Sequence, residues 1–178
     1  GGANQSAALQ GVVSGMAQDD PLAAANFVAD QPSGEGQAKA AVAVASRWAE
    51  MDPAAAAAWA ATFTGDARNQ ALIPVVQRWG QVDPAGAGAW IGALPKDASR
   101  DGIVQRYVDA ITWQYPEQAV QFVAMIGDDK LRARATQNIA QNWINSNPES
   151  AGVWIAGSDL PDDQKRRLLE QVKKRSNP

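Results

Sequence analysis

The residue types of this chain limit the chemistry that it can perform, because the sequence has no His and no Cys. It therefore cannot supply a Ser-His-Asp triad, a Cys nucleophile or a zinc site built from imidazole and thiolate ligands. Pairs of carboxylates remain, and these suffice for glycoside hydrolysis. Nearly every acidic residue, however, stands beside a proline or in a turn-like stretch, where helix capping accounts for it. We expect no catalytic residue, no metal site and no cofactor, and a protein that is not an enzyme.

Two aromatic residues are better candidates for a site. Trp113 and Tyr115 lie just before Pro116, in a stretch that reads as a junction between helices. Aromatic side chains at exposed junctions are common anchors in protein recognition. The alternative is local packing against the helix that follows. We name Trp113 and Tyr115 as the predicted partner-binding residues.

The elements that position this pair come from an internal repeat. Prolines recur at intervals of 32, 31, 32 and 32 residues: Pro21, Pro53, Pro84, Pro116 and Pro148. Six residues after each stands an aromatic (Phe27, Trp59, Trp90, Phe122, Trp154), and five residues before each stands Met16, Trp48, Trp79, Ile111 or Trp143. Six of the 7 Trp residues occupy these two positions, so we expect them to pack between neighbouring units. Trp113 is the seventh, and it replaces the Glu50, Gln81 or Asn145 of other units.

The spacing inside each unit is helical. After each proline, apolar residues recur with the 3.6-residue period of a helix and form one stripe, which predicts a helix that we call helix A. A second such stripe before the next proline predicts a helix B. Asp20, Asp52, Asp83 and Asn147 precede their prolines, as expected of N-caps with Pro at the first helical position. Tyr115 takes the capping position of the fourth unit.

These patterns predict an all-α chain of about 11 helices. We expect one αα-hairpin repeat domain over residues 1–178, arranged as an elongated solenoid or superhelix. Its parts are an N-terminal B-type helix at 1–18 and hairpins at 21–50, 53–81, 84–113, 116–145 and 148–175, the last ending in a basic amphipathic helix.

The Asp-Pro step with an aromatic six residues later resembles the tetratricopeptide repeat, over about Ala8 to Leu169. The period of about 32 residues is two shorter than in that family, and its small residues at the helix crossing have no consistent counterpart here. The chain looks like a divergent bacterial repeat of this kind. The resemblance implies a protein-binding scaffold without catalytic residues.

Three further patterns carry expectations. Away from its aromatic stripe, helix A has only small apolar residues in the second and third units: Ala54, Ala57, Ala58 and Ala61, then Ala85, Gly88, Ala89 and Gly92. We expect this side of helix A to be covered, either by close helix packing or by a ligand in an Ala-lined groove. Arg residues recur at the start of helix B, and we expect acidic partners for them rather than a ladder facing an acidic ligand: Arg68 with Asp66, Arg100 with Asp97, Arg132 with Asp129.

The basic C-terminal helix is expected to be a solvated cap, with an anionic surface or partner as the alternative.

The composition narrows the functional class. With 16 basic and 19 acidic residues and a net charge of -3, no dedicated nucleic-acid surface is expected, and no apolar run is long enough for a membrane span. The predicted function is a non-catalytic scaffold that binds a protein or peptide. The alternatives are a structural spacer or assembly subunit, or an accessory superhelical module of a cell-envelope enzyme.

The compartment is an inference from composition alone. The chain opens with Gly1 and Gly2 in place of Met, which is typical of a mature or excised fragment. A chain without Cys favours a periplasmic or secreted protein, with the cytoplasm as the alternative. The sequence predicts no oligomeric state.

Overall fold

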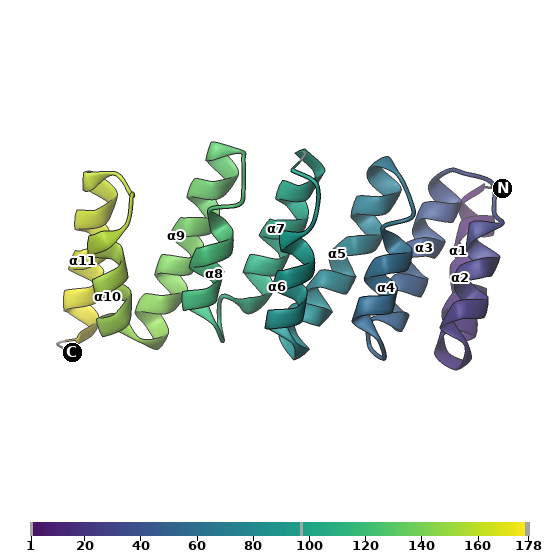
Figure 1. Ribbon diagram of the computed structural model, residues 1–178, viewed down its shortest axis with the longest axis horizontal. Helices are drawn as coiled ribbons and strands as arrows, with labels where there is room; N and C mark the ends of the chain where they lie inside the picture. The colour runs from purple at the N-terminus through teal and green to yellow at the C-terminus, as the bar shows by residue number, and fades with distance from the viewer. Residues whose placement is uncertain (1, 97, 177–178) are drawn as a thin grey trace. The chain divides into compact units, whose positions relative to one another are not determined.

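The computed structural model describes residues 2–96 and 98–176, and these form helices without a strand. The helices are α1 (Gly2–Asp19), α2 (Pro21–Ala29), α3 (Glu35–Trp48), α4 (Pro53–Ala60), α5 (Gly65–Val82), α6 (Pro84–Gly92), α7 (Ala98–Ile111), α8 (Pro116–Val123), α9 (Asp129–Ser146), α10 (Pro148–Gly157) and α11 (Asp162–Ser176). The predicted all-α class with about 11 helices is confirmed for this part of the chain (Figure 1).

Each repeat proline is the first residue of a short helix, because its fixed φ suits that position and its missing N–H would have no partner there. Four of these helices are capped as predicted. The side chains of Asp20, Asp52 and Asp83 each accept a hydrogen bond of 2.9 Å from the backbone N–H three residues later, and Asn147 accepts one of 3.1 Å from Ser150. A side-chain cap of this kind stabilises a helix by about 1 kcal/mol.

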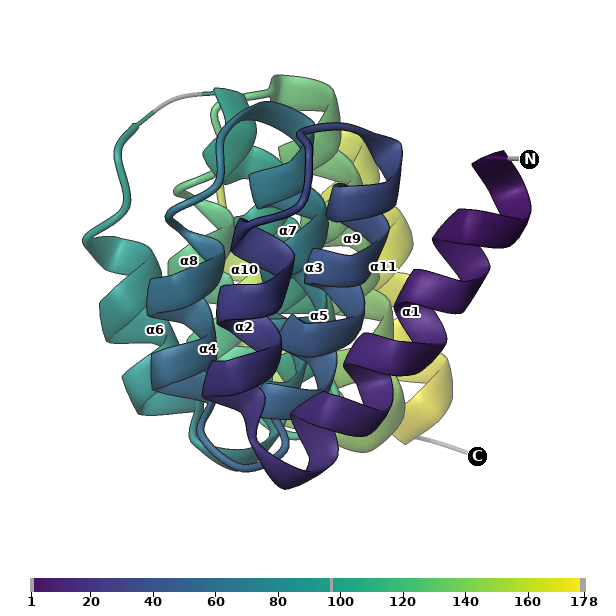
Figure 2. The ribbon, with the colours of Figure 1, turned by 90° about the vertical axis from the view of Figure 1, so that its right-hand side faces the viewer.

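The chain divides into two compact units, Gly1–Tyr107 and Val108–Pro178. In the first unit, α1 packs against α3 and α3 against α5, so the long helices form one layer. The short helices α2, α4 and α6 lie against this layer on one side, which is visible where the unit is seen end-on (Figure 2). Its interior consists mainly of Ala and Val with a few larger side chains such as Leu72, Ile91 and Ile103.

In the second unit, α9 is the central helix and contacts α8, α10 and α11. Its buried face carries Ile139, Ala140 and Ile144, and Ile155 of α10 and Leu168 of α11 are buried as well. α11 has Asp162 and Asp163 in its first turn and Lys173, Lys174 and Arg175 in its last, which is the charge order that the helix dipole favours.

The periodic Trp residues pair across the proline junctions, as their spacing predicts. The ring centroids of Trp48 and Trp59 lie 6.1 Å apart, those of Trp79 and Trp90 also 6.1 Å, and those of Trp143 and Trp154 5.7 Å. In each pair the first ring comes from the long helix of one hairpin and the second from the short helix of the next. The pairs therefore tie consecutive hairpins together.

Two expectations from the sequence are only partly correct. Of the small residues of helix A expected to be covered, Ala57 and Gly88 are buried, but Ala54, Ala58, Ala85, Ala89 and Gly92 are exposed, because α4 and α6 bury only the face turned toward the long helices. Ala is tolerated on an open helix face owing to its high helix propensity.

The second partly correct expectation concerns the arginines. Arg68 donates to Ser99 Oγ at 3.2 Å and not to Asp66. Arg132 does pair with Asp129 as predicted. Arg100 is buried, and its proposed partner Asp97 lies outside the described residues.

Candidate peptide-binding site

A pocket of about 690 Å³ lies within the second unit, at the junction that the sequence singles out. It is bounded by the turn between α7 and α8, the first half of α8, and the end of α9 with its following residue. The residues that line it are Trp113, Gln114, Tyr115, Pro116, Glu117, Gln118, Gln121, Trp143, Ser146 and Asn147. Both residues predicted from the sequence, Trp113 and Tyr115, are therefore brought together in one hollow.

Trp113 and Tyr115 are held open to solvent by the backbone of the turn. The N–H groups of Gln114 and Tyr115 both donate to the carbonyl of Ile111, at 3.1 and 2.7 Å, which closes the end of α7 and fixes the turn. The side chain of Trp113 is 68% exposed and that of Tyr115 is 40% exposed. A Trp this exposed contributes little to folding, so the position has a large apolar surface available for a ligand.

Tyr115 occupies the N-cap position of α8 but makes no side-chain cap. Its phenol cannot reach back to the N–H groups of the first turn in the way that Asp or Asn can. Because the four other proline-initiated helices are capped, Tyr115 costs α8 about 1 kcal/mol relative to its equivalents.

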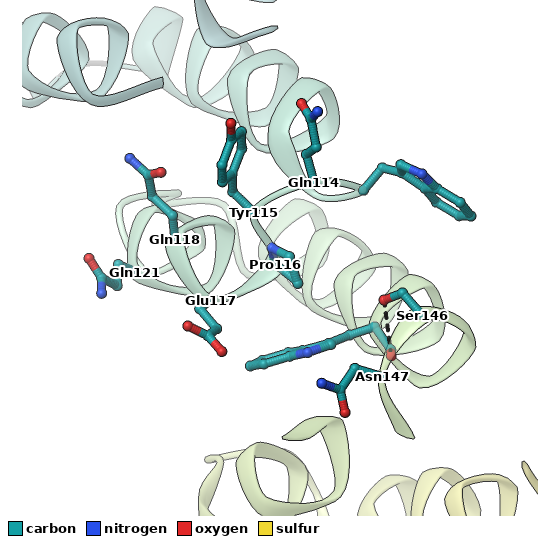
Figure 3. Close-up of a pocket in the computed structure, with 10 residues that line it drawn as sticks. Gln114, Tyr115, Pro116, Glu117, Gln118, Gln121, Ser146 and Asn147 are labelled. Carbon is teal, nitrogen blue, oxygen red and sulfur yellow. Dashed lines mark hydrogen bonds between the residues drawn. The ribbon is translucent and has the colours of Figure 1, made fainter. Parts of the chain in front are cut away.

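The rest of the pocket is polar. Tyr115, Gln114 and Gln118 stand along one side, and Glu117, Ser146 and Asn147 lie along the other (Figure 3). Asn147 uses Oδ1 to cap α10, which leaves its Nδ2 to donate into the pocket. Trp143 supplies an apolar wall of which only 6% is accessible, because its ring stacks on Trp154.

The charge of the lining is negative. Glu117 is its one carboxylate, and the lining contains no Lys or Arg. None of the ion pairs among the described residues includes Glu117, whose position in the first turn of α8 is stabilised by the helix dipole instead. The pocket thus contains an exposed carboxylate without a cation in its lining, in addition to its aromatic residues.

Sequence reasoning missed most of this lining. Gln118 and Gln121 look like ordinary exposed helix residues, and Trp143 and Asn147 have repeat roles in packing and capping. The one usable signal was the break in the repeat at Trp113 and Tyr115, which marks where the pocket begins.

Other hollows are less suited to a ligand. One of about 530 Å³ lies between the turns that precede α3 and α5, and its lining includes Glu35, Asp66 and Phe63. Glu35 is already engaged, because its hydrogen bond and charge interaction with Lys39 lower the pKa of its carboxyl. A smaller hollow of about 210 Å³ between α9 and α11 is bridged by the hydrogen bond from Gln141 to Gln171.

Among the described residues, no group of three or more acidic residues is placed to hold a metal ion. Within the same part of the chain, none of the helices combines the length and the apolar character that crossing a bilayer requires.

In comparisons with known proteins, no protein-family model, curated protein sequence or solved structure matches this chain.

Proposed function

We propose that this protein is a non-catalytic scaffold of αα-hairpin repeats, similar in architecture to tetratricopeptide proteins, that binds a peptide or a segment of another protein at the pocket around Trp113 and Tyr115. Support for the repeat architecture comes from the recurrent proline-initiated helices and from the layered packing inside the first unit. Stacked helical hairpins typically present binding surfaces rather than reaction centres.

The observation that carries the proposal is the pair of exposed aromatics at the one proline junction that departs from the repeat. Trp113 replaces a polar residue and gains little burial, and Tyr115 replaces a cap and forfeits its hydrogen bond. The exposed Trp ring reduces solubility, and the missing side-chain cap reduces the stability of α8. A role in recognition accounts for both residues, because Trp and Tyr are among the residues most enriched in interface hot spots.

The composition of the pocket favours binding over catalysis. Hydrolysis of a glycosidic bond uses two carboxyl groups a few ångströms apart, whereas the lining holds Glu117 alone. Amide and aromatic side chains dominate the remainder, and these recognise ligands by hydrogen bonding and stacking.

The test begins with selection of peptides from a displayed random library on the purified chain. The double variant Trp113→Gln with Tyr115→Asp, which restores the residues typical of the repeat, is expected to weaken the selected peptides by about 1–3 kcal/mol, as measured by calorimetry. Met51→Gln is the matched control, since Met51 is an exposed apolar residue at another proline junction, outside the pocket. Unchanged affinity in a folded double variant would remove the site.

A further inference from the structure

From the chemistry of the pocket we infer the class of its ligand: a proline-rich segment in the polyproline II conformation that carries a Lys or Arg. This inference rests on the proposed function and specifies it. Three properties of the lining lead to it, namely its amides, its aromatic rings and its uncompensated carboxylate.

The amides indicate an extended ligand backbone. Four lining residues are Gln or Asn, and Gln114, Gln121 and Asn147 have side-chain donors that hydrogen-bond to no described residue. A bound helix would already satisfy its own carbonyl groups along its length. An extended or polyproline II segment leaves its carbonyls open and can accept from all of these donors.

The aromatic rings select proline among extended segments. Trp113 and Tyr115 expose flat rings on a short turn, and Trp143 adds an apolar wall. Grooves lined by such rings bind Pro-rich segments, whose rings pack against aromatic faces and whose backbone is already close to its bound conformation. The segment therefore loses little conformational entropy on binding.

The carboxylate of Glu117 indicates a cation in the ligand. It lies exposed in the pocket with no Lys or Arg beside it, so it attracts positive charge and repels an acidic segment. Figure 3 shows Glu117 on the Asn147 side of the pocket, away from Tyr115, so the cation and the prolines have separate places to bind.

The experiment uses fluorescein-labelled peptides of about ten residues, long enough to span the pocket at about 3 Å per residue. One is polyproline ending in Arg, the second ends in Glu instead, and the third is a Gly-Ser peptide ending in Arg. By fluorescence anisotropy on the intact chain, the proline–Arg peptide is expected to bind about tenfold more tightly than either of the others.

Charge selection is assigned by two matched variants. Glu117→Gln is expected to abolish the difference between the peptides that end in Arg and in Glu. Glu149→Gln is the control, because Glu149 is the residue after the repeat proline of α10, as Glu117 is in α8, but lies outside the pocket; it should preserve the difference.

Several results would overturn the inference. They are equal binding of the proline and Gly-Ser peptides, equal binding of the Arg and Glu peptides, or binding of cellohexaose in place of any peptide. If library selection yields peptides that depend on Trp113 and Tyr115 but contain no proline, the proposed function stands and this inference fails. If no peptide depends on those two residues, both fail.

Discussion

Replacement of Tyr107 by Phe should reveal a pH-dependent contribution to the stability of the first unit. Tyr107 lies in α7 and is completely buried, and its hydroxyl donates to the carbonyl of Pro84, the first residue of α6, at 2.7 Å. Burial raises the pKa of this phenol to about 12, and the charge of the nearby Asp83 adds to the effect. The folded unit therefore strongly prefers the neutral phenol.

The magnitude follows from the hydrogen bond and the pKa. At neutral pH, Tyr107→Phe removes one buried hydrogen bond and should cost about 1 kcal/mol. Because the folded pKa lies above the unfolded value of about 10, the unfolded chain loses its proton first as the pH rises. The wild type keeps its full advantage below pH ~10, and between about pH 10 and 12 it loses stability relative to Tyr107→Phe at roughly 1.4 kcal/mol per pH unit. The advantage of about 1 kcal/mol is therefore gone near pH ~11.

The assay is urea unfolding of the wild type and of Tyr107→Phe, followed by circular dichroism at pH ~8 and ~11. The wild type should be about 1 kcal/mol more stable at the lower pH, and the two proteins should be about equally stable at the higher one. Comparing the two proteins at each pH cancels the titration of every other group. An advantage of the wild type that is the same at both values would refute the assignment of Tyr107 as a buried neutral phenol.

Two other substitutions test the difference between repeat positions and pocket positions. Trp90→Ala should destabilise the chain by about 3 kcal/mol in thermal or urea unfolding, because it removes one ring of a Trp pair at a proline junction. Trp113→Ala should cost less than about 0.5 kcal/mol. Similar losses for the two variants would show that Trp113 is a packing residue. Tyr115→Asp should stabilise the chain by about 0.5–1 kcal/mol in the same assay, because it restores the missing cap of α8. Asp52→Ala should destabilise the chain by about as much, because it removes the cap of α4. A destabilised Tyr115→Asp protein would contradict this role of the cap.

Much of the secondary structure was predictable because its causes are local. Proline at the first helical position, Asp or Asn before it and a helical stripe of apolar residues each act within one turn or one helix, so the helix starts at Pro21, Pro53, Pro84, Pro116 and Pro148 could be read directly. The Trp pairs were also accessible, since a constant offset on both sides of each proline places the two rings at the same junction.

Exposure was predicted less well. Away from the aromatic stripe, α4 and α6 carry Ala or Gly on either side, so periodicity could not show that the side with Ala57 and Gly88 is buried and the side with Ala58 and Ala89 is open. Arg68 found Ser99 on another helix instead of the nearby Asp66, because a long side chain takes its partner from tertiary neighbours as readily as from its own turn.

The all-helical class, the helix starts and the departure from the repeat at Trp113 and Tyr115 could be predicted, since all three depend on the order of residues along the chain. That these two residues line a pocket follows only from the folded arrangement. Asn147 and Trp143 lie far along the chain from Trp113, and only the packing of α8 against α9 brings them to the same hollow. The negative charge of the pocket also depends on the fold, because packing determines that Glu117 is the one charged side chain in the lining.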